Sequence, residues 1–389
     1  MCTCVFAPRR LVLVTLLVVL THAAGAQELT VYLLDGSQHQ AAAISGSDDG
    51  RQLSIGDQRL ALADIDRIVV TGQLISDRAQ RAVVLRDGGW LPVSAIAADH
   101  SDHLRCTTTA FGTLTIPLDQ LLAWGPPPWL DRTRPLAASR GAHDRLLLAN
   151  EELNGEVHGV GPKGLIFAPE IAPDTTMTIA LTDVIGLSLG ETPRPPHDPH
   201  LLLDIDPGMP PLFLHPGPTL TIGGLEAAAL EWSALPAGTI RIAGPRRVWL
   251  SELDPALVEE EGAFGVTWPH RRDSNLDGSP LVLDGRRHHR GVVVHSQARL
   301  VWQLGGAYSR FHSLLGIADI VGSEGDCLVV LRVDDQVLWE GRLRGGERPH
   351  SIDAEVSGAQ RLELRVDFGE RYDIGDHVAL AGAWLARAP

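Results

Sequence analysis

Apolar and polar residues alternate in short runs along most of the chain, which is the pattern of β-strands that bury one face. Residues 361–366 give the clearest case, because Leu362, Leu364 and Val366 fall on one face and charged residues on the other. The runs end at Gly, Asp and Pro, and no segment carries a convincing long amphipathic helical period. The sequence therefore predicts an all-β fold.

A short phrase recurs in the first 255 residues and indicates internal repeats. The phrase is a leucine followed by an acidic residue and then a second apolar residue. It occurs at 62–65, 118–121, 181–184 and 250–253. We predict four divergent copies, each a small β-barrel or β-meander. Roughly 45 residues bury little surface alone, so the copies are expected to pack together or to extend a shared sheet.

The copies are assigned to residues 27–75, 76–128, 140–192 and 193–260, and the fourth is degraded and includes a linker. Proline-rich stretches at 126–128 and 193–199 separate the units. Such stretches are expected to act as semi-rigid spacers rather than structured elements.

The pattern changes at Trp268, where the predicted strands become longer and their apolar and polar residues alternate more strictly. About eight strands in roughly 120 residues, with no helical crossover, indicate an antiparallel β-sandwich over residues 261–389. The predicted strands are 281–283, 291–295, 299–304, 311–317, 327–333, 337–339, 352–356, 361–366 and 378–385, with a hairpin turn at Asp334-Asp335.

The first 26 residues have the composition of a secretory signal peptide. Two arginines precede the apolar run from Leu11 to Leu20, and Ala24-Gly25-Ala26 supplies the small residues that a signal peptidase accepts. The apolar run is too short for a membrane span. We expect Sec-type cleavage near Ala26, a secreted or periplasmic location and no transmembrane helix in the mature protein.

Charge and cysteine content narrow the function. The 389-residue chain has 33 basic and 48 acidic residues and a formal net charge of −15, which argues against nucleic acid as a partner. Cys106 and Cys327 are the cysteines that remain after leader removal. Two distant thiols form no disulfide framework, and neither has an adjacent histidine to activate it, so both are expected to be buried.

Several short phrases follow one another in a fixed order in the last domain, at 290–296, 308–311, 315–317, 333–339, 356–359, 362–364 and 376–377. In this order they resemble the NPCBM family of carbohydrate-binding modules, and the resemblance covers about residues 268–387. It implies a galactose-binding-like jelly roll that recognises carbohydrate, although Leu380 stands where the family commonly has tryptophan.

A sugar site normally combines an aromatic face with a few polar groups. Loops at the ends of a sandwich carry binding more often than strands do, and four candidates share one loop. Trp302 and Trp384 lie in predicted strands and are assigned to the core. The carbohydrate-binding candidates are the loop residues Tyr372, Asp373, Asp376 and His377, together with His295, Arg310 and Trp339.

A second constellation has the oxygen ligands of a structural calcium site. Asp273, Asn275 and Asp277 alternate before a glycine, and Asp284 follows at the twelfth position. The alternative is an ordinary Asx-turn, because Pro280 and the strand-like flanks exclude an EF-hand. Calcium is the sole cofactor that the sequence suggests.

Three functions remain at this stage. The first is a secreted, non-catalytic protein with a C-terminal carbohydrate-binding module. The second is a cell-envelope scaffold that contacts a protein partner, and the third is a glycoside hydrolase or its accessory. The Gly-x-Ser-x-Gly pattern at 186–190 gives little support to a hydrolase, because prolines follow it where a nucleophile elbow needs a helix.

Overall fold

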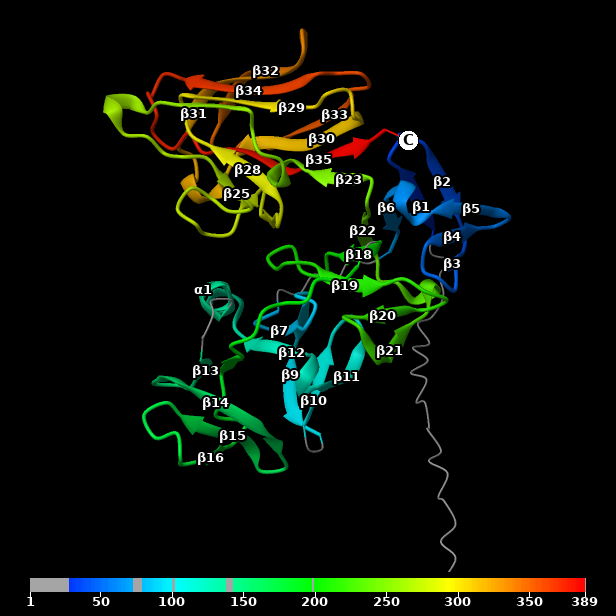
Figure 1. Ribbon diagram of the computed structural model, residues 1–389, viewed down its shortest axis with the longest axis vertical. Coiled ribbons are helices and arrows are strands. Elements are labelled where there is room, and N and C mark those ends of the chain that lie inside the picture. The colour runs from blue at the N-terminus through cyan, green and yellow to red at the C-terminus, as the bar shows by residue number, and fades with distance from the viewer. Residues whose placement is uncertain (1–27, 73–78, 100–101, 138–142, 198, 389) are drawn as a thin grey trace, which may run out of the picture.

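The computed structural model describes residues 28–72, 79–99, 102–137, 143–197 and 199–388 (Figure 1). Within these ranges the chain forms 35 strands, one α-helix and six short 3-10 helices. The all-β prediction is confirmed. The predicted leader lies outside the described residues. No helix in the part of the chain that is described is both long and apolar enough to span a membrane.

Each of the four predicted copies contributes one set of antiparallel strands. In every copy the first strand pairs with the last one, which closes the copy on itself. The strands are β1 (Leu29–Leu33), β2 (Gln38–Ala41), β3 (Ile44–Gly46), β4 (Gln52–Ile55), β5 (Gln58–Ala61) and β6 (Ile65–Val70) in copy 1; β7 (Arg81–Leu85), β8 (Trp90–Val93), β9 (Ala95–Ala98), β10 (His103–Thr108), β11 (Gly112–Pro117) and β12 (Leu121–Gly125) in copy 2; β13 (Asp144–Leu147), β14 (Glu152–Gly161), β15 (Gly164–Pro169), β16 (Met177–Ile179) and β17 (Gly186–Ser188) in copy 3; and β18 (His200–Leu203), β19 (Leu212–His215), β20 (Leu220–Ile222), β21 (Leu225–Leu230) and β22 (Gly238–Ala243) in copy 4.

The copies join in pairs through their last strands. Strand β6 pairs with β22, where Ile68 lies opposite Ile240, so copies 1 and 4 share an eight-stranded sheet. Strand β12 pairs with β17 and joins copies 2 and 3 in the same way. One apolar core runs through all four copies from Leu29 to Ile242. The copies therefore extend shared sheets, as predicted, and form one N-terminal unit.

The repeated phrase marks a tight turn before the last strand of a copy. It forms the 3-10 helices η1 (Leu62–Asp64) and η2 (Leu118–Gln120) in copies 1 and 2. In copy 4 the equivalent turn is η3 (Trp232–Ala234), between β21 and β22. The phrase at 250–253 instead forms η4 (Leu250–Glu252) in the last domain, with Leu250 in that domain's core. The assignment of 250–253 to copy 4 is wrong, because the same local turn serves either context.

The first proline-rich stretch is not a spacer, which corrects a second prediction. Helix α1 (Pro127–Ala137) begins inside it and packs Trp129 and Leu130 against the sheet of copies 2 and 3. Proline at the first turn of a helix lacks only a donor that would have no partner there, so Pro127 and Pro128 favour a helix start. The second stretch, 193–197, has no regular structure.

The last domain is an antiparallel sandwich of two sheets, as predicted. Its core lies between the sheets and includes Leu362, Leu364 and Val366 on one strand face. Strands β23 and β24 precede the predicted start at residue 261. One sheet has β25 (Arg271–Arg272), β28 (Gly291–Val294), β35 (Val378–Arg387), β30 (Tyr308–Ile317), β33 (His350–Glu355) and, beside β35, β23 (Arg247–Trp249); the other has β24 (Leu257–Glu260), β29 (Ala298–Gln303), β34 (Arg361–Phe368), β31 (Asp326–Val333) and β32 (Gln336–Arg344).

Three short elements lie outside these two sheets. A small hairpin of β26 (Val282–Leu283) and β27 (Arg286–Arg287) precedes β28. The 3-10 helices η5 (Ala263–Gly265) and η6 (Asp319–Val321) lie in connections. Tight turns complete the strand pairs, and Asp334 adopts a φ of 48° in the predicted two-residue turn between β31 and β32.

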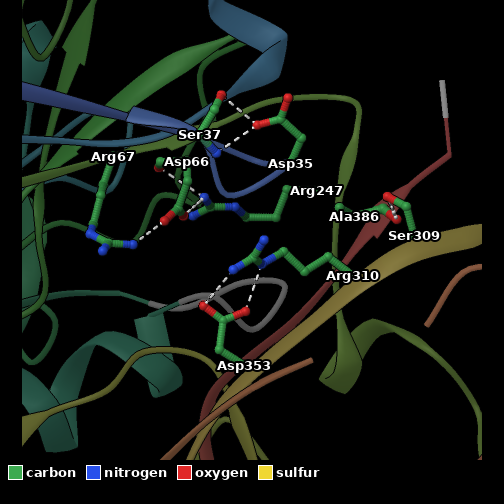
Figure 2. A network of polar contacts seen from close by, with 9 residues as sticks. All are labelled: Asp35, Ser37, Asp66, Arg67, Arg247, Ser309, Arg310, Asp353 and Ala386. Carbon is green, nitrogen blue, oxygen red and sulfur yellow. Dashed lines mark hydrogen bonds and ion pairs between the residues drawn. The ribbon is translucent and has the colours of Figure 1, made fainter. Parts of the chain in front are cut away.

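The N-terminal unit and the sandwich meet across an interface with an apolar part and a charged part. Figure 2 shows its polar contacts. Trp249 and Trp384 of the sandwich pack with Leu34 and Leu202 of the N-terminal unit. The buried Arg247 guanidinium donates to the Asp66 carbonyl oxygen at 2.8 Å and forms an ion pair with its carboxylate. The two parts are thus joined by packing and by a buried charge pair.

A glycine allows a close approach at the same interface. Gly36 lies in the turn after β1 with a φ of 91°, and a Cβ there would come within 2.1 Å of Arg310 Nη1 of the sandwich. Arg310 is held by Asp353 through bonds of 2.6 and 2.9 Å, so its guanidinium cannot easily move aside. The Asp-Gly turn of copy 1 therefore fits the sandwich only with glycine at this position.

We expect stability to fall below neutral pH because of a half-buried interface histidine. The pKa of His288 is lowered to about 4, chiefly by burial and then by the charges of Arg241 and Arg286. The unfolded chain binds this proton near pH 6.5, so stability is complete above that pH and is lost as the pH falls toward 4. The expected loss between pH 7 and pH 5 is about 2 kcal/mol, measured by urea unfolding.

The matched controls for this prediction are two substitutions. His288→Gln should remove the part of the pH dependence that His288 contributes and leave the part due to His289, His312 and His377, whose pKa values are also lowered by burial. His197→Gln, at an exposed loop position, should leave the pH dependence unchanged. An identical slope in the wild-type protein and in the His288→Gln variant would contradict the assignment.

Candidate functional site

Strand register brings three rings together at one end of the sandwich. Val294 at the end of β28 lies opposite Val378 at the start of β35, so the next residues, His295 and His377, face each other. Strand β25 pairs with the other edge of β28, and Trp268 lies three residues before β25. The ends of three neighbouring strands therefore place one indole and two imidazoles at the same end of the sheet.

The ring contacts match this register. The Trp268 ring stacks on His295 with centroids 5.9 Å apart and planes 30° apart. The His295 and His377 rings meet edge to face at 5.6 Å, and Trp268 lies 6.5 Å from His377. Trp268 is 45% exposed, whereas His295 is buried. The outcome is an indole face open to solvent and backed by two imidazoles, which we call the Trp268 platform.

The loop before β35 is fixed to the rest of the sandwich beside this platform. Asp376 is fully buried and accepts hydrogen bonds from Ser296 Oγ at 2.5 Å and from the Asp326 backbone N–H at 2.8 Å. Asp373 accepts a hydrogen bond from the backbone N–H of Ala263, in the segment that leads to Trp268. These two carboxylates have anchoring roles, since both are held by protein donors.

Tyr372 is the exposed aromatic residue of the same loop. Its side chain is 64% exposed, and its backbone has a φ of 58°, which is unusual for a residue other than glycine. The loop therefore presents an aromatic ring at the end of the sandwich that carries the Trp268 platform.

Burial shapes the protonation states at the platform. Burial, and then His295, lower the pKa of His377, while the Asp277 carboxylate raises it. The Nδ1 atom of His377 is buried and has no hydrogen-bond partner among the described residues. Burial also raises the pKa of Asp376, although its hydrogen bonds from Ser296 and Asp326 act in the opposite direction. A neutral imidazole beside an open indole can donate a hydrogen bond to one hydroxyl group through its N–H and accept one from another through its second ring nitrogen.

Two sugar-binding candidates from the sequence lie elsewhere. Arg310 is near the opposite end of β30 and belongs to the interface with the N-terminal unit. Trp339 lies on the edge strand β32, with its ring 5.0 Å from that of His350. The structure therefore brings together His295, His377 and the Tyr372 loop, and it separates Arg310 and Trp339 from them.

The four calcium candidates do not converge. Asp273 pairs with Arg290 at 2.9 Å, and Asp277 accepts from the Ser279 hydroxyl and backbone N–H. Asn275 is buried and donates to the Pro280 carbonyl oxygen, and its Oδ1 has no partner in the described residues. The fourth, Asp284, is exposed next to the 3-10 helix η6. No cluster of three or more His, Cys, Asp or Glu side chains suited to a metal occurs in the described ranges.

Sequence reasoning missed Trp268 as a site residue. It used this position as the start of the sandwich, because Trp268 lies outside any apolar alternation. This position outside a strand could have identified Trp268 as a site residue, because a tryptophan in an irregular segment does not fill the core between the sheets. By contrast, Trp302 is 1% exposed and Trp384 is 5% exposed, so both are buried as predicted.

Cys106 and Cys327, the cysteines of the described residues, are buried and unpaired, as expected. Burial raises the pKa of Cys106 to about 12 and that of Cys327 still further. Ser188, in the Gly-x-Ser-x-Gly pattern, is fully buried in strand β17. A catalytic nucleophile is accessible to substrate and is activated by a lowered pKa or an adjacent base, whereas these three side chains are buried.

Comparisons with known proteins point to carbohydrate-associated relatives. The chain is 26% identical over 91 residues to a Renibacterium salmoninarum protein named "Putative endo-alpha-N-acetylgalactosaminidase". This alignment covers 23% of the chain and only 6% of that relative's length.

Solved structures of CBM51 modules also match. One is the CBM51 module of a Clostridium perfringens GH95 protein in complex with methyl-galactose, at 21% identity and a TM-score of 0.32, over 36% of this chain and 99% of that one. Another is the tandem CBM51 modules of a Streptococcus pneumoniae family 98 glycoside hydrolase, at 11% identity and a TM-score of 0.32, over 92% of this chain and 100% of that one.

The family profile described as NPCBM/NEW2 domain matches residues 246–386. These limits coincide with the sandwich, whose strands run from β23 at Arg247 to β35 at Arg387. The fold and the profile thus agree on the extent of this module: the C-terminal part of this chain matches the NPCBM/NEW2 domain and has an antiparallel β-sandwich fold.

Proposed function

We propose that this protein is an exported, non-catalytic protein that binds carbohydrate through the Trp268 platform of its NPCBM domain. The observation that carries the proposal is the half-exposed indole of Trp268, held against His295 and beside His377. Export is inferred from the predicted leader, and the four-copy unit is inferred to serve as the base on which the module is mounted.

The chemistry of the platform suits a pyranose. One face of a pyranose ring presents C–H groups, which pack on an aromatic face, while its hydroxyls need hydrogen-bond partners. Trp268 supplies the face, and the imidazoles of His295 and His377 supply donors or acceptors according to tautomer. Because the platform is an open surface at the end of a sandwich, it suits the end of a glycan chain rather than a buried substrate.

The absence of catalytic function is part of the proposal. Catalytic carboxylates of a glycosidase must flank the bond to be cleaved and must differ in pKa. At the platform, the buried Asp376 carboxylate accepts hydrogen bonds from Ser296 and from the Asp326 backbone N–H. The Asp373 carboxylate accepts one from the Ala263 backbone N–H. Both acids therefore hold the loop in place, and neither is proposed to act on a glycosidic bond.

The proposal is tested by applying the chain from residue 27 onward to an immobilised glycan array, with calcium and with a chelator. We expect retention on a restricted set of terminal pyranosides, competed by the free sugar. Retention that requires calcium would assign a role to the 273–284 loop. No retention on any glycan under either condition would contradict the proposal. Capture of one protein partner that persists in excess sugar would favour the scaffold function instead.

A further inference from the structure

A cavity of about 320 Å³ lies where the N-terminal unit meets the NPCBM domain. Both parts form its walls. The N-terminal unit contributes residues of β6, of β22 and of the segment after β18, and the NPCBM domain contributes residues of β23, β27, β30, β33 and β35. Neither part alone encloses this space. Ligand sites are common at such domain boundaries, and the volume is near the lower end of the usual ~300–1,000 Å³ range.

The walls are far richer in arginine than the rest of this acidic chain. Four arginines and four aspartates line the cavity, whereas the whole chain has 33 basic and 48 acidic residues. Asp204 is paired with Arg241 at 2.9 Å, and Asp353 is paired with Arg310 at 2.6 Å. Asp66 is paired with Arg247.

The remaining carboxylate at the cavity is also occupied. Asp206 accepts hydrogen bonds from the backbone N–H groups of Ala79 and Gly208. Each aspartate is therefore compensated by a cation or by backbone donors. Arg286 is exposed at the cavity and forms no ion pair with a carboxylate in the described part of the chain.

Several buried polar atoms at the cavity have no hydrogen-bond partner. Arg241 Nε and His288 Nε2 are both in this state, and one belongs to each part of the protein. Arg247, which lies behind Asp66, leaves Nε and Nη1 without partners as well. A buried polar group without a partner costs about 1–3 kcal/mol. The arginine nitrogens favour a ligand that supplies oxygen acceptors, whereas His288 Nε2 favours a hydroxyl donor, because the N–H of this neutral ring is directed at the Leu283 backbone.

The cavity also has an aromatic and apolar side. Trp249 and Trp384 line it, and the Trp384 ring stacks on that of His312 at 5.5 Å. Met209 and Leu314 complete the apolar lining. Trp249 and Trp384 are only 7% and 5% exposed, so they offer the cavity an apolar edge and not an open face. The C–H groups of a sugar gain from contact with such an edge, whereas a simple inorganic anion does not.

We propose that this interdomain cavity binds a carboxylated pyranose, such as a uronic acid residue. The carboxylate lies with the guanidinium of Arg286, and the C–H groups of the sugar ring contact the edges of Trp249 and Trp384. The hydroxyls donate to the compensated aspartates and to His288 Nε2, and they accept from Arg241. This site is separate from the Trp268 platform. It forms only when the four-copy unit and the NPCBM domain are docked.

The test is calorimetric titration of the chain from residue 27 onward with free D-glucuronate, D-glucose and inorganic phosphate. Every measurement is made in a Trp268→Ala background, so that the platform cannot contribute and the two proposals fail separately. We expect one glucuronate per chain and at least tenfold weaker binding of glucose, because one lost charge-assisted contact of about 1.5–3 kcal/mol corresponds to that factor. Phosphate should also bind at least tenfold more weakly, because it keeps the charge but lacks the C–H groups that contact the apolar wall.

Two variants locate the site. Arg286→Gln removes an exposed cation and should weaken glucuronate binding at least tenfold, and Ser351→Trp should fill the cavity from the exposed edge strand β33 and abolish binding. Ser357→Trp, exposed after the same strand but outside the cavity lining, is the matched control and should bind normally. No heat with glucuronate, equal affinity for phosphate, or unchanged binding in Ser351→Trp would overturn the proposal.

Discussion

Replacing Trp268 with alanine is expected to abolish glycan retention by the NPCBM domain, with a loss of affinity of at least tenfold. The substitution removes the open aromatic face and leaves His295 and His377 without the ring that stacks or tilts beside them. Tenfold in affinity corresponds to 1.4 kcal/mol, which is within the range of a single aromatic contact. Because Trp268 is 45% exposed, the substitution should cost only about 1 kcal/mol of folding stability.

The matched control is Trp339→Ala in the same module. Trp339 packs against His350 on the edge strand β32, away from the platform, so this variant should retain glycan binding. Both variants are measured on the glycan that the array identifies, with urea unfolding to check the fold. Retained binding in Trp268→Ala, or an equal loss in Trp339→Ala, would move the sugar site away from the platform.

The sequence was sufficient for features that depend on neighbouring residues. The alternation in 361–366 predicts strand β34 and its buried face, and all three predicted core residues are buried. The pair Asp334-Asp335 predicts the turn between β31 and β32. Strand period and turn chemistry are local properties, so they can be read from a single segment.

Features that depend on distant residues could not be predicted in this way. The pairing of copy 1 with copy 4 requires Ile68 to lie opposite Ile240, and any apolar strand end would have fitted the local pattern equally well. The same limit applies to the candidate site. His295 and His377 were identified separately as polar candidates, but their contact follows from the register of β28 and β35.

Arg310 shows how a polar residue in a strand can be assigned to the wrong role. Its charge and its place in a matching family phrase made it a sugar-binding candidate. The structure uses it to hold Asp353 and to contact the Gly36 turn, which is more than 270 residues earlier in the chain. Interface and ligand contacts need the same residue types, so composition alone does not separate them.

Asp66→Ala is expected to cost the largest amount of stability of any single substitution discussed for this protein, about 3–5 kcal/mol. Only 1% of the Arg247 side chain is exposed, and its guanidinium lies 4.8 Å from the Trp384 ring and 5.5 Å from the Trp249 ring. Burial lowers the pKa of Arg247 to about 10, so the group is still charged at neutral pH. Without Asp66 this buried charge has no carboxylate to compensate it.

Arg67→Ala is the matched control, because Arg67 pairs with the same Asp66 carboxylate from a position where its side chain is 36% exposed. Exposed ion pairs contribute about 0–1 kcal/mol, so this variant should unfold almost as the wild-type protein does. Replacing both charges, in the double variant Asp66→Asn with Arg247→Met, should recover most of the lost stability, since neither buried charge remains.

Urea unfolding gives the free energies, and small-angle X-ray scattering reports whether the two parts stay docked. Asp66 lies on β6 of the N-terminal unit and Arg247 on β23 of the NPCBM domain, so the penalty for Asp66→Ala can be relieved by separating the parts and hydrating Arg247. We therefore expect a larger radius of gyration and two separate unfolding transitions in this variant alone. A single transition with a loss no greater than that of Arg67→Ala would show that this ion pair does not hold the two parts together.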